Sequence, residues 1–277
     1  MSVFDVAIIG SGPGGYVAAI RCSQLGMKTA LIEKYNTLGG TCLNVGCIPS
    51  KSLLDSSHHF EDATKHFSEH GIEIKGEVNI DFKKMIERKA QVVEQTTTGI
   101  DFLMGKNNIE VFHGLASFID ANKIEINGDK KTSIESKKII IATGSKPGSL
   151  PFIELDKERI ITSTEALKLK EIPKHLIIIG GGVIGLELGQ VYKRLGAEVS
   201  VIEYADRITP SMDMSLSREL MKVLKKQGVK FYLSHGVSNV KRNDKEITVT
   251  ANDKKGGSTE FKGDYCLVSV GRKPHTK

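Results

Sequence analysis

The feature that most constrains the fold is a glycine-rich turn that the chain contains twice, at an offset of 170 residues. The first copy comprises Gly10, Gly12 and Gly15, and the second comprises Gly180, Gly182 and Gly185. A short, apolar, β-branched run precedes each copy, as is typical of a buried parallel strand. A single turn of this kind is weak evidence, but two complete copies in register predict two similar nucleotide-binding units.

Each position of such a turn has a physical role. The first glycine permits a tight turn, the second lets a pyrophosphate approach the backbone, and the third lets the following helix pack closely on the strand. The N–H groups and the dipole at the helix N-terminus then face the phosphates. The alternative is a glycine-rich turn without a ligand.

An acid follows each turn at the same distance. Glu33 and Glu203 stand 18 residues after the third glycine of their copy, each at the end of a second apolar run. A carboxylate at this place suits the hydroxyls of a ribose. Glu203 would repel a 2′-phosphate, so we expect NAD rather than NADP, although Arg207 follows closely.

The whole pattern predicts an α/β protein with two Rossmann-like domains, parallel sheets and small antiparallel additions. The expected domains are 1–148 and 149–270, with 271–277 beginning a return to the first domain. Helices are expected at about 15–26, 52–70, 81–105, 185–196 and 214–227. Strands are expected at about 28–33, 109–112, 115–119, 123–126, 138–142, 198–203, 230–233, 237–241, 246–251 and 264–270.

The composition of the chain indicates which classes of partner and which cellular compartment to expect. Lys+Arg minus Asp+Glu is 39 − 33 = +6, aromatic residues are only 6%, and tryptophan is absent. This favours solvated lysine-rich faces over a nucleic-acid interface. No apolar run reaches the roughly 18 residues of a membrane helix, so no membrane partner is expected. Four cysteines do not make a secreted disulfide framework, and a reducing cytoplasm is expected.

Two cysteines, Cys42 and Cys47, have the spacing C-x4-C. Zinc sites usually need shorter spacing and a second pair, so no metal is expected. In a regular helix the two Cα atoms would be about 8.7 Å apart, whereas a disulfide needs less than about 7 Å. A bridge therefore requires a broken turn, which Gly46 and Pro49 could supply. In a reducing compartment such a bridge is more typical of catalysis than of structure, the alternative being two ordinary thiols.

The other cysteines and four of the histidines are not expected to take part in chemistry. Cys22 and Cys266 fall in apolar patterns and are expected to be small core residues. The histidines at 58, 59, 66 and 70 stand among polar neighbours, and we expect them on the surface.

The run from Gly39 to Lys51, taken with the two glycine turns, resembles the pyridine nucleotide–disulfide oxidoreductase family, and within it the branch that oxidises dihydrolipoamide. Further similarity lies at Ala142–Pro147, Gly180–Glu187 and Val270–Pro274. The resemblance covers essentially the whole chain. Members of the family continue for a substantial further stretch, which carries a His–Glu pair and an interface domain. Both are expected to be missing here, so the activity of this chain alone is left open.

The resemblance implies that electrons pass from a cysteine pair through FAD to NAD⁺. It implies that Cys42 exchanges with dihydrolipoamide, that Cys47 lies next to the flavin, and that Lys51 by the flavin ring pairs with Glu187. For FAD it implies contacts from Gly10, Gly12, Gly15, Glu33, Gly39, Gly40, Thr41, Cys42, Lys51, Gly114, Thr143, Gly144 and Ser145. For NAD it implies contacts from Gly180, Gly182, Gly185, Glu187, Glu203, Val237 and Gly271.

The resemblance also implies partners: a lipoyl domain of a 2-oxo acid dehydrogenase complex or of the glycine cleavage system, and a second copy of the full-length protein in a homodimer. Two alternatives stay open. One is another disulfide reductase on the same frame, of the mercuric or glutathione type. The other is a catalytically incomplete fragment that binds FAD and NAD.

Overall fold

The computed structural model describes residues 3–244 and 246–276. The chain forms two compact units. Unit 1 comprises Met1–Pro49, Ala90–Lys146 and Pro274–Lys277, and unit 2 comprises Ser50–Lys89 and Pro147–Lys273. The expected domain boundaries stay a prediction. The compact units differ from them chiefly in one segment, because residues 50–89 pack with unit 2.

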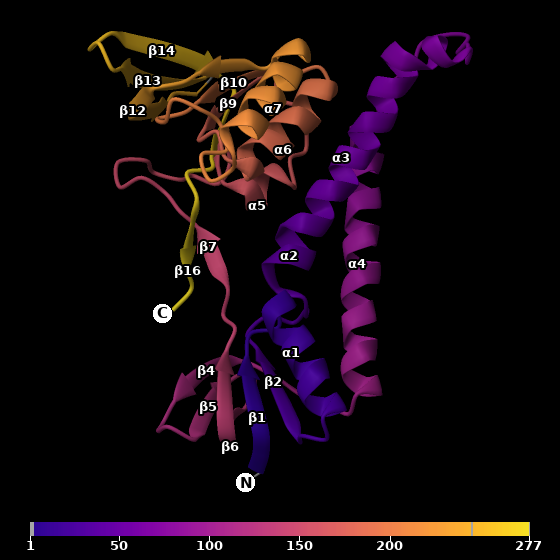
Figure 1. The fold of residues 1–277 in the computed structure, drawn as a ribbon, viewed down its shortest axis with the longest axis vertical. Coiled ribbons are helices and arrows are strands. Elements are labelled where there is room, and N and C mark those ends of the chain that lie inside the picture. Colours follow the sequence, from indigo (N-terminus) through magenta and orange to yellow (C-terminus); the bar gives the residue numbers. More distant parts are fainter. Residues whose placement is uncertain (1–2, 245, 277) are drawn as a thin grey trace. The chain divides into compact units, whose positions relative to one another are not determined.

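Unit 1 is built on a six-stranded sheet with the order β3-β2-β1-β6-β5-β4. Its strands are β1 (Val3–Ile9), β2 (Thr29–Glu33), β3 (Glu110–His113), β4 (Leu115–Phe118), β5 (Lys123–Asn127) and β6 (Lys131–Ile141). The strands β3, β2, β1 and the later part of β6 are parallel, while β4 and β5 add an antiparallel hairpin. Helix α1 (Pro13–Gln24) lies along β1 and β2 (Figure 1). This is the first nucleotide-binding unit that the repeat predicts.

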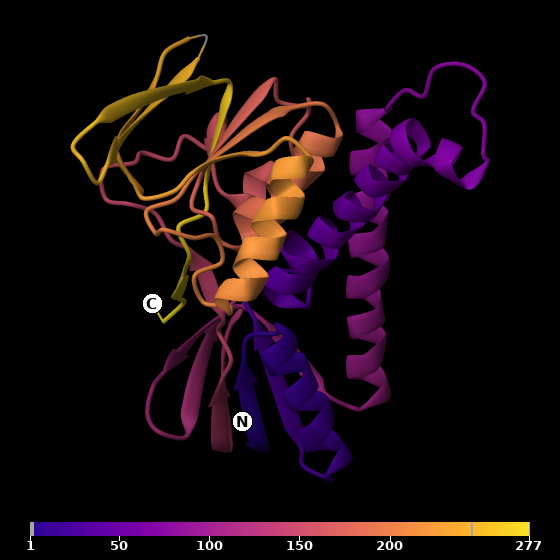
Figure 2. The same ribbon diagram turned by 45° about the horizontal axis from the view of Figure 1, so that its top comes forward.

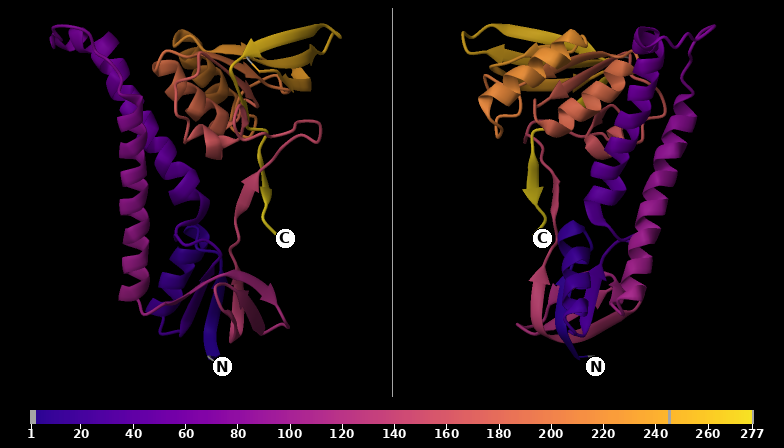
Figure 3. Two further views of the ribbon diagram at one scale, coloured as in Figure 1. Left: turned by 180° about the vertical axis from the view of Figure 1, so that it is seen from behind. Right: turned by 45° about the vertical axis from the view of Figure 1, so that its right-hand side comes forward.

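Unit 2 repeats the plan with a five-stranded parallel sheet in the order β11-β10-β9-β15-β8. Its strands are β8 (Ile160–Ile161), β9 (His175–Ile179), β10 (Glu198–Ile202), β11 (Lys230–Tyr232) and β15 (Tyr265–Val268). The helices α5 (Ser163–Ala166), α6 (Val183–Arg194) and α7 (Met214–Lys226) lie beside this sheet (Figure 2). A separate antiparallel sheet consists of β12 (His235–Arg242), β13 (Ile247–Asp253) and β14 (Ser258–Gly263) (Figure 3).

The remaining elements are short, except for the helices α3 and α4. They are α2 (Gly40–Val45), α3 (Cys47–Glu61), a π-helical turn at Asp62–His66, a 3₁₀ turn at Phe67–His70, the long helix α4 (Phe82–Lys106), and the paired strands β7 (Ser145–Pro147) and β16 (Arg272–Pro274).

The predicted fold class is confirmed, and most predicted elements are present within a few residues. The helix expected at 52–70 instead starts at Cys47 and loses its α-helical hydrogen bonding after Glu61. Strand β14 was not predicted, because only Phe261 of its six residues is buried and its sequence shows no alternation of apolar and polar residues. Cys266 is buried in β15 and Cys22 lies half-buried in α1, as expected. His58, His59, His66 and His70 are exposed.

Each unit has its own apolar core. In unit 1 the core includes Ile8 and Leu31 from the parallel strands and Ala19 from α1. In unit 2 it includes Ile178 and Val199 from the strands. Among the described residues, every helix is too short or too polar to cross a membrane.

One buried hydroxyl in unit 2 yields a test of this packing. The Tyr192 hydroxyl donates to the carbonyl of Ala166, and burial raises the pKa of Tyr192. We expect Tyr192→Phe to lower the free energy of unfolding by about 1–2 kcal/mol, because the buried carbonyl loses its donor. Thermal unfolding of the full-length protein measures the effect. Tyr204→Phe, at a side chain that is 81% exposed, is the control, and equal midpoints for both variants would contradict the assignment.

Candidate functional site

The first glycine turn is shaped by two close backbone approaches. Gly10 has φ +100°, and a Cβ there would collide with the carbonyl of Ala142, which follows β6. A Cβ on Gly15 would collide with the carbonyl of Gly10. The first and third glycines are therefore required by packing within unit 1, which places the N-terminus of α1 directly after β1.

The second turn has the same geometry in unit 2. Gly180 has φ +104°, and a Cβ there would lie 2.6 Å from the carbonyl oxygen of Ser269, which follows β15. A Cβ on Gly185 would lie 2.8 Å from the carbonyl oxygen of Gly180. At Gly182, by contrast, a Cβ would meet no described heavy atom within 4 Å. Protein packing does not explain a glycine there, whereas a pyrophosphate against the backbone does.

Each acid is hydrogen-bonded to its own turn. Glu33 is buried and accepts from the N–H of Ser11 at 2.9 Å and from the N–H of Tyr35 at 3.0 Å. Glu203 accepts from the N–H of Gly181 at 2.5 Å and from the N–H of Ala205 at 2.7 Å. The repeat is thus preserved at the level of single hydrogen bonds, and each carboxylate lies at the turn that a dinucleotide would occupy.

The two units share one more pair of equivalent backbone hydrogen bonds, which the sequence pattern does not indicate. The N–H of Gly39 donates to the carbonyl of Ser11 at 3.0 Å, and the N–H of Thr209 donates to the carbonyl of Gly181 at 2.9 Å. Thr209 is the counterpart of Gly39 in the second copy. The sequence does not reveal it, because the contact is made by the backbone and the two residue types differ. Thr209 adopts φ +43°, a left-handed conformation that is uncommon for a β-branched residue.

The cysteine segment packs against the first turn. Gly39 and Gly40 have φ +97° and +58°, and a Cβ on Gly40 would lie 2.6 Å from the Cα of Gly12. Cys42 is half-buried and Cys47 is exposed.

The expected break between the cysteines is present and lies at Gly46. Helix α2 ends at Val45, Gly46 has φ −146° and ψ −116°, and α3 starts at Cys47. A Cβ on Gly46 would lie 2.8 Å from the Thr41 carbonyl oxygen and 3.2 Å from the Cys42 Cα. Pro49 does not form the break. It lies in the first turn of α3, where proline is tolerated.

Lys51 and Glu187 meet within unit 2. The Nζ atom of Lys51, on α3, lies 2.7 and 2.9 Å from the two carboxylate oxygens of Glu187, on α6. The expected ion pair is therefore present. Lys51 stands one helical turn after Cys47 in α3, and Glu187 stands in the helix that follows the second glycine turn.

The other predicted positions lie at strand ends. Gly114 is buried with φ +154° after β3, and its N–H donates to the carbonyl of Glu33 at 2.8 Å. Gly144 (φ +70°), between Thr143 and Ser145, follows β6, and Gly271 (φ +107°) follows β15. Val237 lies half-buried at an irregularity of β12. Their ligand contacts stay predictions. Over the described residues, no group of three or more His, Cys, Asp or Glu side chains could hold a metal ion.

Residues 4–277 match the family described as pyridine nucleotide-disulphide oxidoreductase, and the chain belongs to this family. It is similar to mitochondrial dihydrolipoyl dehydrogenase of Dictyostelium discoideum (48% identity over 98% of this chain and 57% of the relative). It is also similar to dihydrolipoyl dehydrogenase 3 of Pseudomonas putida (44%, over 100% of this chain and 60% of the relative). The chain thus spans less than two thirds of these relatives.

Solved structures agree with this placement. A Cu(II) complex of the HOCl-induced flavoprotein disulfide reductase RclA from Escherichia coli superposes with a TM-score of 0.84 at 28% identity. The match covers 100% of this chain and 58% of that one. The family uses FAD and NAD(H). The two turns fit such dinucleotides, because glycines leave the backbone of each turn accessible and an acid is hydrogen-bonded to each turn.

Two glycines of the second turn differ in the space around them, since a Cβ would clash at Gly185 but not at Gly182. We expect Gly185→Ala to destabilise unit 2 by about 1–3 kcal/mol, since the methyl group overpacks against Gly180. We expect Gly182→Ala to keep the parent stability but to weaken NAD binding by about tenfold or more. Thermal unfolding and calorimetric titration of the full-length protein measure the two effects. A destabilised Gly182→Ala with unchanged NAD affinity would contradict this division of roles.

The break at Gly46 yields a second test. We expect Gly46→Ala to slow disulfide formation between Cys42 and Cys47 by about tenfold, because the new methyl group pushes the backbone of Cys42 away. Thiol trapping after timed oxidation, read by mass spectrometry, measures the rate. Gly99→Ala is the control, since its Cβ meets nothing within 4 Å among the described residues. An unchanged rate in Gly46→Ala would show that the break does not set the sulfur positions.

Proposed function

We propose that this chain is the FAD- and NAD-binding part of a dihydrolipoyl dehydrogenase, which oxidises dihydrolipoamide to lipoamide with NAD⁺ as the final acceptor. The observation that carries the proposal is the segment from Gly39 to Lys51. Cys42 and Cys47 lie on either side of the helix break at Gly46. Lys51, one helical turn after Cys47, forms an ion pair with Glu187. Relatives that share 42–48% identity with the chain include many of this name.

The substrate step is thiol–disulfide exchange. A substrate thiolate attacks the Sγ atom of Cys42 in the Cys42–Cys47 disulfide, and Cys47 leaves as a thiolate. The second substrate thiolate attacks the substrate sulfur of the mixed disulfide and releases Cys42. Dihydrolipoamide thereby loses two electrons and two protons, and the cysteine pair gains two electrons. Bound FAD and NAD⁺ supply the acceptors that carry these electrons away.

The chain's own residues prepare this step. Cys47 is the first residue of α3, where the partial positive charge of a helix N-terminus suits a sulfur that carries negative charge. Lys51 adds a cation on the same helix, and Glu187 holds its ammonium group. Gly46 keeps Cys42 and Cys47 on separate helices, so that the sulfurs can approach each other.

The second turn favours NAD over NADP. The Glu203 carboxylate, held by Gly181 and Ala205, would repel a 2′-phosphate. Arg207, the nearby cation, donates from its guanidinium to the carbonyl of Pro210 at 3.2 Å.

We also propose the setting of the full-length protein. Its substrate would be carried by a lipoyl domain of a 2-oxo acid dehydrogenase complex or of the glycine cleavage system. The protein would act as a homodimer in a reducing compartment such as the cytoplasm. The lipoyl substrate follows from the proposed reaction and from the name dihydrolipoyl dehydrogenase that the relatives carry.

The test uses the full-length protein that contains this chain. We expect dihydrolipoamide to drive NAD⁺ reduction, and we expect Cys42→Ser and Cys47→Ser each to lower the rate by about a thousandfold or more, because the disulfide cannot form. Cys22→Ser, in α1, is the matched control and retains the parent rate. Turnover that depends on NADPH and glutathione disulfide, or that survives loss of Cys42, would contradict the proposal.

A further inference from the structure

We infer that Glu61 and Arg194 are positioning residues that hold α3 against α6 in the register that brings Lys51 to Glu187. The inference rests on the proposed function only in that Lys51 and Glu187 belong to its site. The contact itself is a property of unit 2 and is measured without turnover.

The Lys51–Glu187 pair is too exposed to position two helices. The Lys51 side chain is 58% exposed and that of Glu187 is 26% exposed. Ion pairs in contact with water contribute little, because solvent screens the charges and two long side chains lose conformational freedom. Something else must therefore fix α3 on α6.

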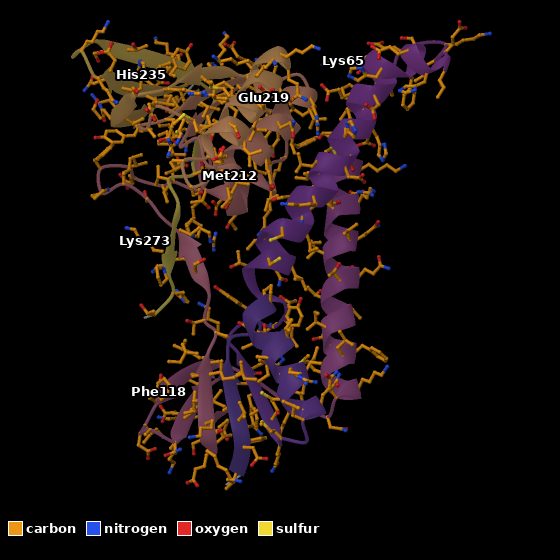
Figure 4. The ribbon with its side chains drawn as sticks, viewed as in Figure 1. Lys65, Phe118, Met212, Glu219, His235 and Lys273 are labelled. Carbon is orange, nitrogen blue, oxygen red and sulfur yellow. The ribbon has the colours of Figure 1, made fainter. Side chains whose placement is uncertain are left out.

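A second ion pair joins the same two helices and is largely buried. The Nε atom of Arg194 lies 2.8 Å from a carboxylate oxygen of Glu61, with side chains 11% and 7% exposed. The other Glu61 oxygen accepts from Lys65 at 3.2 Å, and Arg194 also donates to the Leu54 carbonyl at 3.4 Å. Figure 4 labels Lys65 just beyond the end of α3. Removing one partner of such a buried pair leaves an uncompensated charge, so the pair strongly favours one arrangement.

The spacing makes this arrangement specific. Glu187 and Arg194 are seven residues apart in α6, which places them on one face at a separation of about 10 Å. Lys51 and Glu61 lie about 15 Å apart along α3. The apolar core between the ion pairs includes Leu53. Ten residues turn α3 through about 80° less than three full turns, so Lys51 and Glu61 point in different directions around its axis, whereas Glu187 and Arg194 share one face of α6. Two polar attachments at different angles, together with the apolar contacts, oppose rotation and sliding of α3 more strongly than the exposed pair does.

Another ion pair on α3 serves as a matched control. Arg88 of α4 contacts Asp55 at 3.1 Å and Ser52 at 3.1 Å, with side chains of the ion pair about half exposed. It ties α3 to α4 and not to α6. If weakening any contact of α3 were enough to break the Lys51–Glu187 pair, Arg88→Met would break it as well.

The experiment measures the acylation rate of Lys51 by sulfo-NHS-acetate in the full-length protein, read by mass spectrometry. The main variant is Glu61→Met/Arg194→Met, which removes both charges and keeps apolar volume. We expect the Lys51 rate to rise about two- to fivefold, to the level of Glu187→Gln, which matches the loss of an exposed ion pair. Lys131, paired with Glu125 at 2.7 Å in unit 1, is the internal reference and keeps its rate.

The outcomes are decisive in both directions. Arg194→Lys keeps the charge but loses the contact to Leu54, and we expect an intermediate Lys51 rate. Arg88→Met should stay within about 1.5-fold of the parent, since its pair is exposed and not on α6. A parent rate for Lys51 in both Arg194 variants, or an equal rise in Arg88→Met, would overturn the inference. A full-length protein without dihydrolipoamide turnover would contradict the proposed function and leave this result standing.

Discussion

The structure depends on one steric constraint, the close approach of a glycine turn to the strand beside it. Gly10 lies against the carbonyl of Ala142, and Gly180 lies against the carbonyl of Ser269. Side chains at these positions would push each turn away from the end of the neighbouring strand. The approach places the N-termini of α1 and α6 at the carboxyl ends of parallel strands, where the N–H groups of a helix can meet phosphates. Both nucleotide positions follow from it.

The segment that contains Cys42 and Cys47 depends on the first glycine turn, because Gly40 packs against Gly12 of that turn. Gly40 can pack on Gly12 because Gly40 lacks a side chain, and Gly46 then interrupts the helix between Cys42 and Cys47. The helix that resumes at Cys47 carries Lys51 to Glu187. Further along the same helix, the buried pair of Glu61 and Arg194 joins it to α6. Within unit 2, two ion pairs thus join α3 to α6.

Much of this was predictable from the sequence, and the exceptions have physical reasons. The glycine spacing and the acids Glu33 and Glu203 are local patterns, and the structure gives both copies the same hydrogen bonds. Thr209 was missed because it acts through its backbone. The pair of Glu61 and Arg194 was missed because it joins residues 133 positions apart in the chain, which no periodicity marks. The packing of residues 50–89 with unit 2 has the same long-range origin.

We propose that Cys42 and Cys47 form the redox pair that exchanges with a dithiol substrate. The most direct measurement treats the oxidised full-length protein with dihydrolipoamide without air, blocks the new thiols with one alkylating reagent, and locates them by mass spectrometry. We expect new thiols at Cys42 and Cys47, with labelling of Cys22 and Cys266 unchanged by the substrate. Substrate-dependent labelling at Cys22 or Cys266, or none at the Cys42–Cys47 pair, would contradict it.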